Sequence, residues 1–85
     1  MGDFEIHIRW SERFRDGVCH VRGVALAHGQ EFQLTGEAPV DHGDEMGARC
    51  RAKRRALIGF GMSASTVCSL PDEQLIPDSI GLKGL

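Results

Sequence analysis

The sequence predicts a small α+β domain in which a three-stranded antiparallel meander is followed by one helix that packs on it. Two observations lead to this fold class. Three segments in the first half of the chain combine apolar and polar residues in strand-like alternation, and glycine-containing turns separate them. A longer segment with helical spacing of small apolar residues follows. With 85 residues, of which 41% are hydrophobic and 26% charged, the chain suits one folded domain.

The first strand is expected over residues 3–10, because apolar side chains occupy its even positions from Phe4 to Trp10. Polar residues 11–17, which end in an Asp-Gly pair, are expected to turn the chain. A second strand is then expected over residues 18–27.

The alternation of the second strand changes parity along its length. Cys19 and Val21 occupy odd positions, whereas the larger apolar residues Val24 and Leu26 occupy even ones. One extra residue in a strand reverses the direction of all later side chains, and glycine tolerates the required geometry. We therefore expect a β-bulge at Gly23.

This bulge fixes the register of the first hairpin. It sets Glu5 opposite Arg22, a favourable ion pair, and His7 opposite His20. The two imidazoles would be candidate ligands for a divalent metal ion. Two ligands do not complete a metal site, so exposed histidines on a polar strand face are the competing interpretation.

A tight turn around Gly29 leads to a third strand, expected over residues 31–37. Phe32 and Leu34 face the core in this strand, and the polar residues between them face outward. Pro39 ends the sheet, because proline cannot donate a hydrogen bond to a neighbouring strand.

A helix is expected over residues 44–60, where acidic residues at the start complement the helix dipole. Every fourth residue from Ala48 to Ala56 is alanine, which lets the helix lie close to the sheet. Arg49 and Lys53 fall inside the same apolar arc. Either their aliphatic stems extend past it to water, or a partner covers that side.

Residues 65–70 have enough β-propensity for a short fourth strand. We place the boundary of the domain after them and treat residues 71–85 as an irregular C-terminal tail. Five apolar side chains make this tail too hydrophobic for a solvated end, so it is expected to pack on the domain or on a second subunit.

The three cysteines, Cys19, Cys50 and Cys68, are odd in number and widely spaced, which fits neither a disulfide framework nor a zinc ribbon. We expect reduced thiols and a cytoplasmic protein. No apolar segment is long enough to cross a bilayer, and no motif for a cofactor is present.

A basic cluster on the expected helix gives the strongest local signal for binding. Arg51, Arg54 and Arg55 lie on one side of it, where they would grip the phosphates of a nucleic acid. The competing interpretation is an ordinary solvated helix face, because arginine is a good helix former.

Part of the chain resembles the second half of a double-stranded RNA-binding domain. The resemblance consists of the strands, the segment Thr-Gly-Glu-Ala at residues 35–38 and the alanine-rich helix at residues 52–57. It covers less than half of the chain. The additional first helix of that family is absent, and Asp-Glu-Met at residues 44–46 replaces its basic helix start. No site residue is transferred from this resemblance.

No set of residues has the spacing of a catalytic site. Cys19 and His20 are neighbours, but successive side chains on a strand point to opposite faces. We therefore expect a non-catalytic binding or regulatory module that acts through protein–protein interaction as a homodimer. The alternatives are a nucleic-acid-binding domain that uses the basic helix, and an enzyme whose site forms at a subunit interface.

Overall fold

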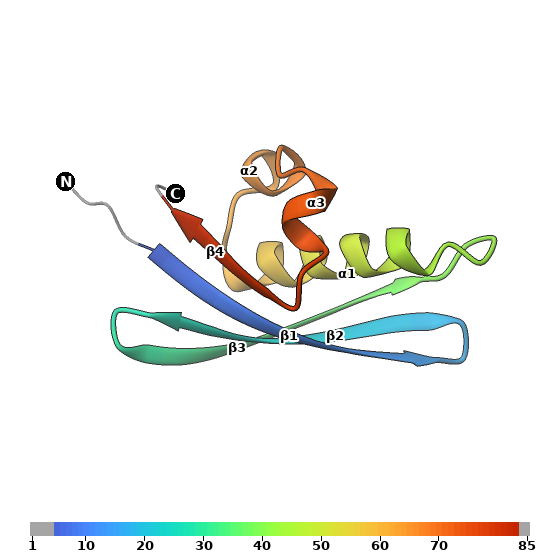
Figure 1. Ribbon diagram of the computed structural model, residues 1–85, viewed down its shortest axis with the longest axis horizontal. Coiled ribbons are helices and arrows are strands. Elements are labelled where there is room, and N and C mark those ends of the chain that lie inside the picture. Colours follow the sequence, from blue (N-terminus) through green and yellow to red (C-terminus); the bar gives the residue numbers. More distant parts are fainter. Residues whose placement is uncertain (1–4, 84–85) are drawn as a thin grey trace.

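The computed structural model describes residues 5–83, which form one antiparallel sheet and a layer of helices (Figure 1). The elements, in chain order, are β1 (Glu5–Arg15), β2 (Val18–Ala27), β3 (Gln30–Pro39), α1 (Glu45–Phe60), α2 (Ala64–Cys68), α3 (Asp72–Leu75) and β4 (Ser79–Lys83). The strand order is β3-β2-β1-β4. All the helices lie on one side of the sheet, and no element of residues 5–83 covers the other side. The predicted α+β fold, with a meander and one main helix, is confirmed.

β1 is longer than predicted, because it continues through residues 11–15 instead of turning there. Asp16 and Gly17 alone make the turn, with φ angles of 53° and 74°. These left-handed conformations suit the two-residue turns of twisted hairpins. The polar residues before the turn belong to a strand with one solvated face. Residues 3–4 of the predicted strand, including Phe4, lie outside the described residues.

The predicted β-bulge at Gly23 is wrong, because β2 keeps one alternation from end to end. Gly23 faces the helices opposite Trp10, and a Cβ atom at this glycine would lie 2.8 Å from the indole ring. The glycine therefore makes room for the tryptophan side chain. Val24 and Leu26 are exposed on the uncovered side of the sheet.

Without the bulge, the register of the first hairpin differs from the predicted one. Cys19 lies opposite Phe14, close to the turn. Arg22 lies opposite Ser11, so the predicted pairing of this arginine with Glu5 does not form. The long first hairpin explains both changes, since its two-residue turn fixes the register of all the residues before it.

The main helix forms as predicted. Asp44 is its N-cap and accepts a hydrogen bond from the backbone N–H of Gly47 at 2.9 Å, and Gly61 follows its last residue with a φ of 120°. The alanines at positions 48, 52 and 56 are fully buried. A Cβ atom at Gly36 of β3 would collide with the carbonyl oxygen of Ala52, so this glycine permits the close approach of helix and sheet.

The strand predicted over residues 65–70 is wrong, because this segment contains α2. The hydroxyl of Ser63 caps α2 and accepts a hydrogen bond from the backbone N–H of Thr66 at 3.3 Å. Val67 is fully buried in the core. A side-chain cap and a buried anchor therefore outweigh the β-propensity of these residues.

The fourth strand lies in the C-terminal tail. β4 pairs with β1, and Ile80 lies opposite Ile8 with both side chains buried. Leu75 of α3 is also fully buried. The tail therefore packs on the domain of its own chain, and Leu85, the last of its apolar residues, lies outside the described range.

Candidate functional site

Two arginines of the predicted nucleic-acid site donate hydrogen bonds to backbone carbonyls at the edge of the sheet. Arg51 donates from Nη2 to the carbonyl oxygen of Pro39 at 3.1 Å, and Arg55 donates from Nη1 to that of Glu37 at 2.8 Å. β3 is an edge strand, so these carbonyls point away from β2. Guanidinium groups that cover outward carbonyls block the approach of another strand at this end.

The third arginine of this cluster joins α1 to the C-terminal segment. Arg54 donates from Nη2 to the carbonyl oxygen of Leu70 at 2.9 Å and to a carboxylate oxygen of Asp72 at 2.6 Å. All three predicted arginines lie on α1, but Arg51 and Arg55 reach the β3 edge whereas Arg54 reaches the C-terminal segment. Each of them also bonds a backbone carbonyl, so part of their hydrogen-bonding capacity serves the fold.

The rest of the β3 edge carries no such cover. In an antiparallel strand the N–H and C=O of one residue point the same way, and the direction alternates along the chain. Because the carbonyls of Glu37 and Pro39 point outward, the backbone groups of Glu31, Gln33 and Thr35 point outward too. Within residues 5–83, no helix, turn or side chain bonds these groups. They form a short open edge.

The two histidines proposed as metal ligands do not meet. His7 lies opposite Leu26, whereas His20 lies opposite Arg13, six residues further along β1. Six residues of strand span about 20 Å. His20 pairs instead with Glu37, with 3.2 Å between Nδ1 and Oε2. The described part of the chain contains no cluster of three or more residues that would hold a metal ion.

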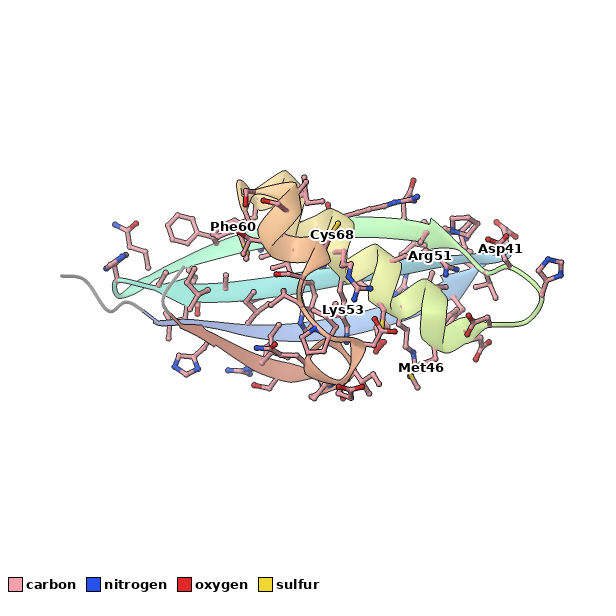
Figure 2. All side chains as sticks on the ribbon, turned by 90° about the horizontal axis from the view of Figure 1, so that it is seen from above. Asp41, Met46, Arg51, Lys53, Phe60 and Cys68 are labelled. Atoms are coloured by element: carbon pink, nitrogen blue, oxygen red, sulfur yellow. The ribbon has the colours of Figure 1, made fainter. Side chains whose placement is uncertain are left out.

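Lys53, a cation in the apolar arc of α1, is completely buried. Its Nζ donates to the carbonyl oxygens of Leu75 at 2.6 Å, Ile76 at 3.3 Å and Pro77 at 3.3 Å. It also lies 5.7 Å from the ring centroid of Trp10. Figure 2 shows Lys53 where α1 meets the C-terminal segment. The cover that this arc required is thus provided by the same chain.

Burial lowers the pKa of the Lys53 ammonium, and the negative charges of Glu12 and Asp78 oppose this shift. An ammonium group has three protons, and three carbonyl oxygens receive them here. The lysine is therefore a fully satisfied structural group that clamps the C-terminal segment.

Arg49, the other cation in this arc, extends toward the far end of β1. Its Nε lies 3.0 Å from a carboxylate oxygen of Glu12, and its guanidinium carbon lies 5.5 Å from the ring centroid of Phe14. The arginine is half-buried and the carboxylate is largely buried. The negative charge of Glu12 therefore compensates the positive charge of Arg49, which α1 places against the sheet.

The cysteines do not form a nucleophilic site. Burial raises the pKa of the Cys19 and Cys50 thiols, so both are protonated at neutral pH. Cys68 is exposed on α2, and all three are free thiols. Cys19 points to the helices and His20 to the uncovered face, as the alternation of a strand predicts.

The uncovered face of the sheet carries a depression of about 600 Å³ that sequence reasoning missed. Its lining comes from β1, β2 and β3, and consists of Ser11, Glu12, Arg13, His20, Val21, Arg22, Thr35, Gly36 and Glu37. Ser11, Arg22 and Thr35 form one row across the strands. The sequence did contain a signal for this face, a strand-like alternation of charged residues in positions 11–15. The high polarity of the segment instead led to the prediction of a turn.

No protein-family model, curated protein or solved structure matches this chain. Among the helices formed by residues 5–83, none combines the length and the apolar character that a membrane span requires. The open edge of β3 and the uncovered face of the sheet are therefore the features that point to a function.

Proposed function

We propose that this protein is a non-catalytic binding module that acts through protein–protein contact, as a homodimer joined at the open edge of β3. The supporting observation is the set of outward backbone groups at Glu31, Gln33 and Thr35, which have no partner among the described residues. Open strand edges pair readily with other strands, and proteins use them for recognition.

A two-fold axis at Gln33 gives the pairing that uses the whole open edge. In an antiparallel pair of identical strands, Gln33 then lies opposite its own copy and Glu31 lies opposite Thr35, so no like charges oppose each other. Phe32, which is 39% exposed, lies opposite Leu34 of the partner and loses part of its exposed surface. Its ring already contacts Phe60 at 5.7 Å between centroids.

The flanking arginines limit this pairing to one register. Arg51 and Arg55 cover the carbonyls at the far end of β3, so a strand shifted toward them would have to displace both guanidinium groups. The other edge of the sheet, β4, has only five residues. A short edge offers fewer backbone hydrogen bonds, which favours β3 as the contact.

Replacement of Gln33 by proline tests the proposal. The N–H of this residue points away from β2, so proline removes a hydrogen-bond donor from the dimer while the pairing with β2 remains. We expect the unmodified protein to be a dimer in sedimentation equilibrium, and Gln33→Pro to be a folded monomer. Gln33→Thr, the matched control, keeps the N–H and should remain dimeric. Equal association of the proline and threonine variants would refute the edge as the contact.

Cross-linking tests the register independently. In a background with Cys68→Ser, the variant Gln33→Cys places two cysteines opposite each other across the two-fold axis, at a Cα separation of about 5.5 Å. This variant should form a disulfide-linked dimer under mild oxidation. Thr35→Cys should not, because its copy lies several residues away. Efficient linkage of both variants, or of neither, would contradict the proposed pairing.

The alternative of nucleic-acid binding by the basic helix has less support. Arg51, Arg54 and Arg55 each donate to backbone carbonyls, and Arg54 also pairs with Asp72. An acidic neighbour and engaged donors weaken the attraction of this surface for phosphate groups.

A further inference from the structure

We propose that the uncovered face of the sheet binds the sugar–phosphate backbone of a single-stranded nucleic acid, through Arg9, Arg13 and Arg22. This surface lies on the opposite side of the molecule from the helix cluster that the sequence singled out. It is separate from the proposed dimer contact at β3 and consists of different residues.

The three arginines form a continuous stripe. Arg9 and Arg13 lie on β1, and Arg22 of β2 lies opposite Ser11, between them along the strand direction. Arg15 continues the stripe toward the hairpin turn. From Arg9 to Arg15 the strand advances by about 20 Å, since each residue of a strand rises about 3.3 Å.

The guanidinium groups of Arg9, Arg13 and Arg22 are available to a ligand, whereas that of Arg15 lies 3.9 Å from a carboxylate oxygen of Asp16. Arg9, Arg13 and Arg22 are exposed, and the described residues give them no hydrogen bond or ion pair. They differ in this respect from the arginines of α1, which bond backbone carbonyls. Free arginine donors match the oxygens of a phosphate group, which they can bind in pairs.

Positive charge is concentrated on this face although the whole chain has a net charge of -2. Over residues 6–39, the strands place four arginines on this side against two glutamates, Glu31 and Glu37. One of them, Glu37, lies 3.2 Å from the imidazole of His20. The acidic residues of α3 and of the start of α1 lie on the helix side. The uncovered face therefore has a positive electrostatic potential that attracts a polyanion.

The shape and chemistry of the face favour an extended phosphodiester chain. A stripe of four arginines is longer than one phosphate group, so a ligand with regularly repeated charges uses more of it. The hydroxyls of Ser11 and Thr35 lie in the same row as Arg22 and can donate to phosphate oxygens. No phenylalanine or tryptophan side chain of the described strands points to this side, so strong stacking on bases is not expected and neither is sequence preference.

Exposed apolar residues next to the arginines can contact the parts of the ligand between its phosphates. Val24 lies opposite Arg9 and Leu26 lies opposite His7 on the same face, with 37% and 47% of their surface exposed. They offer apolar contact to sugars or to the edges of unstacked bases while the arginines hold the phosphates.

Fluorescence anisotropy with labelled single-stranded DNA and RNA of mixed sequence tests the inference. We expect binding to the full chain that weakens as salt is raised. Arg13→Gln combined with Arg22→Gln should lower the affinity at least about tenfold, and should lower the slope of log affinity against log salt by about 1.4, or 0.7 for each lost phosphate contact. Arg13→Lys with Arg22→Lys keeps the charge and should retain most of the binding.

The matched control is Arg51→Gln with Arg55→Gln, which removes the same charge from the opposite layer and should leave the affinity for an oligonucleotide short enough to contact one copy within about twofold. Thermal melting followed by circular dichroism should show that all variants are folded. Absence of binding at about 50 mM salt, or an equal loss in the control, would overturn the inference. Equally tight, arginine-dependent binding of a labelled polyglutamate peptide would also overturn it and assign the face to acidic peptides.

The dimer and the stripe are tested separately. Pairing at β3 would place the uncovered faces of two copies side by side, and a long oligonucleotide could contact both. An oligonucleotide short enough to contact one copy should bind Gln33→Pro and the unmodified protein alike. Loss of this binding in the proline variant would show that the stripe alone is not the site.

Discussion

The Nζ atom of Lys53 lies 2.6 Å from the carbonyl oxygen of Leu75, although 22 residues separate them in the sequence. The contact joins the centre of α1 to the end of α3, and two further carbonyls of the same segment share the ammonium group. The segment then continues into β4, which pairs with β1. A single side chain therefore connects the C-terminal third of the chain to the helix that covers the sheet.

Substitution of Lys53 by methionine should destabilise the protein by about 1–3 kcal/mol, because three carbonyls lose their donor while the apolar stem is retained. Removal of the buried charge offsets part of this loss. The free energy of unfolding from urea titration gives the total effect. Hydrogen exchange should show the greatest loss of protection in β4.

Arg51→Met is the matched control, since it removes a donor from the same helix at a half-exposed site that bonds one carbonyl. We expect a change within about 0.5 kcal/mol. If Lys53→Met were as mild as this control, the clamp would contribute nothing to stability.

Stability should also respond to pH through Lys53. Burial lowers the pKa of this amine in the folded chain, so between the folded value and the ordinary value of about 10.4 the unfolded chain binds more protons. The free energy of unfolding, taken as the difference from Lys53→Met, should therefore rise as pH increases through this window and stay constant below it. The thiols of Cys19 and Cys50 act in the opposite direction, and the charge of Lys53 lowers their pKa, so both proteins are compared in a Cys19→Ala, Cys50→Ala background. A difference that falls with pH would contradict the lowered pKa.

Local signals were sufficient to predict the fold class. The helix from residue 45 to residue 60 begins at an acidic cap and ends at a glycine, and both features act within a few residues of the chain. The Asp-Gly and His-Gly turns are equally local, since their left-handed backbone suits these residue types. Element types therefore followed from the sequence in most of the chain.

The register of the first hairpin did not follow from the sequence, because a contact between neighbouring strands determines it. The apparent change of parity at Gly23 results from the indole of Trp10, which fills the space above the glycine from the neighbouring strand. A pattern read along one strand contains no information about its neighbour. The same reason explains the failed pairing of His7 with His20.

The candidate site was missed for a related reason. Alternation of polar and apolar residues in positions 11–15 was obscured because Glu12, which faces the helices, is polar as well. Its ion pair with Arg49 is a long-range contact that periodicity does not reveal. Only the structure shows that Arg13 and Arg22 share one open face.

Substitutions at two glycines should separate a backbone obstacle from a side-chain obstacle. At Gly36, an added methyl group meets the carbonyl oxygen of Ala52 in α1, which cannot move unless the whole helix shifts. At Gly23, it meets only side-chain atoms, those of the Trp10 ring and of Ile8. We expect Gly36→Ala to destabilise the protein by about 3 kcal/mol or more, and Gly23→Ala by about 1–3 kcal/mol. Urea titration measures both values.

The fluorescence of Trp10, the single tryptophan of the chain, distinguishes the two mechanisms. Its emission should change in Gly23→Ala, where the ring itself moves, and should remain closer to the native spectrum in Gly36→Ala. Gly59→Ala is the control, because this exposed helical glycine has open space around it, and alanine there should stabilise the protein by about 0.5–1 kcal/mol. If Gly36→Ala were as harmless as Gly59→Ala, the close packing of α1 on β3 would be wrong, and with it the position of the arginines that cover the edge.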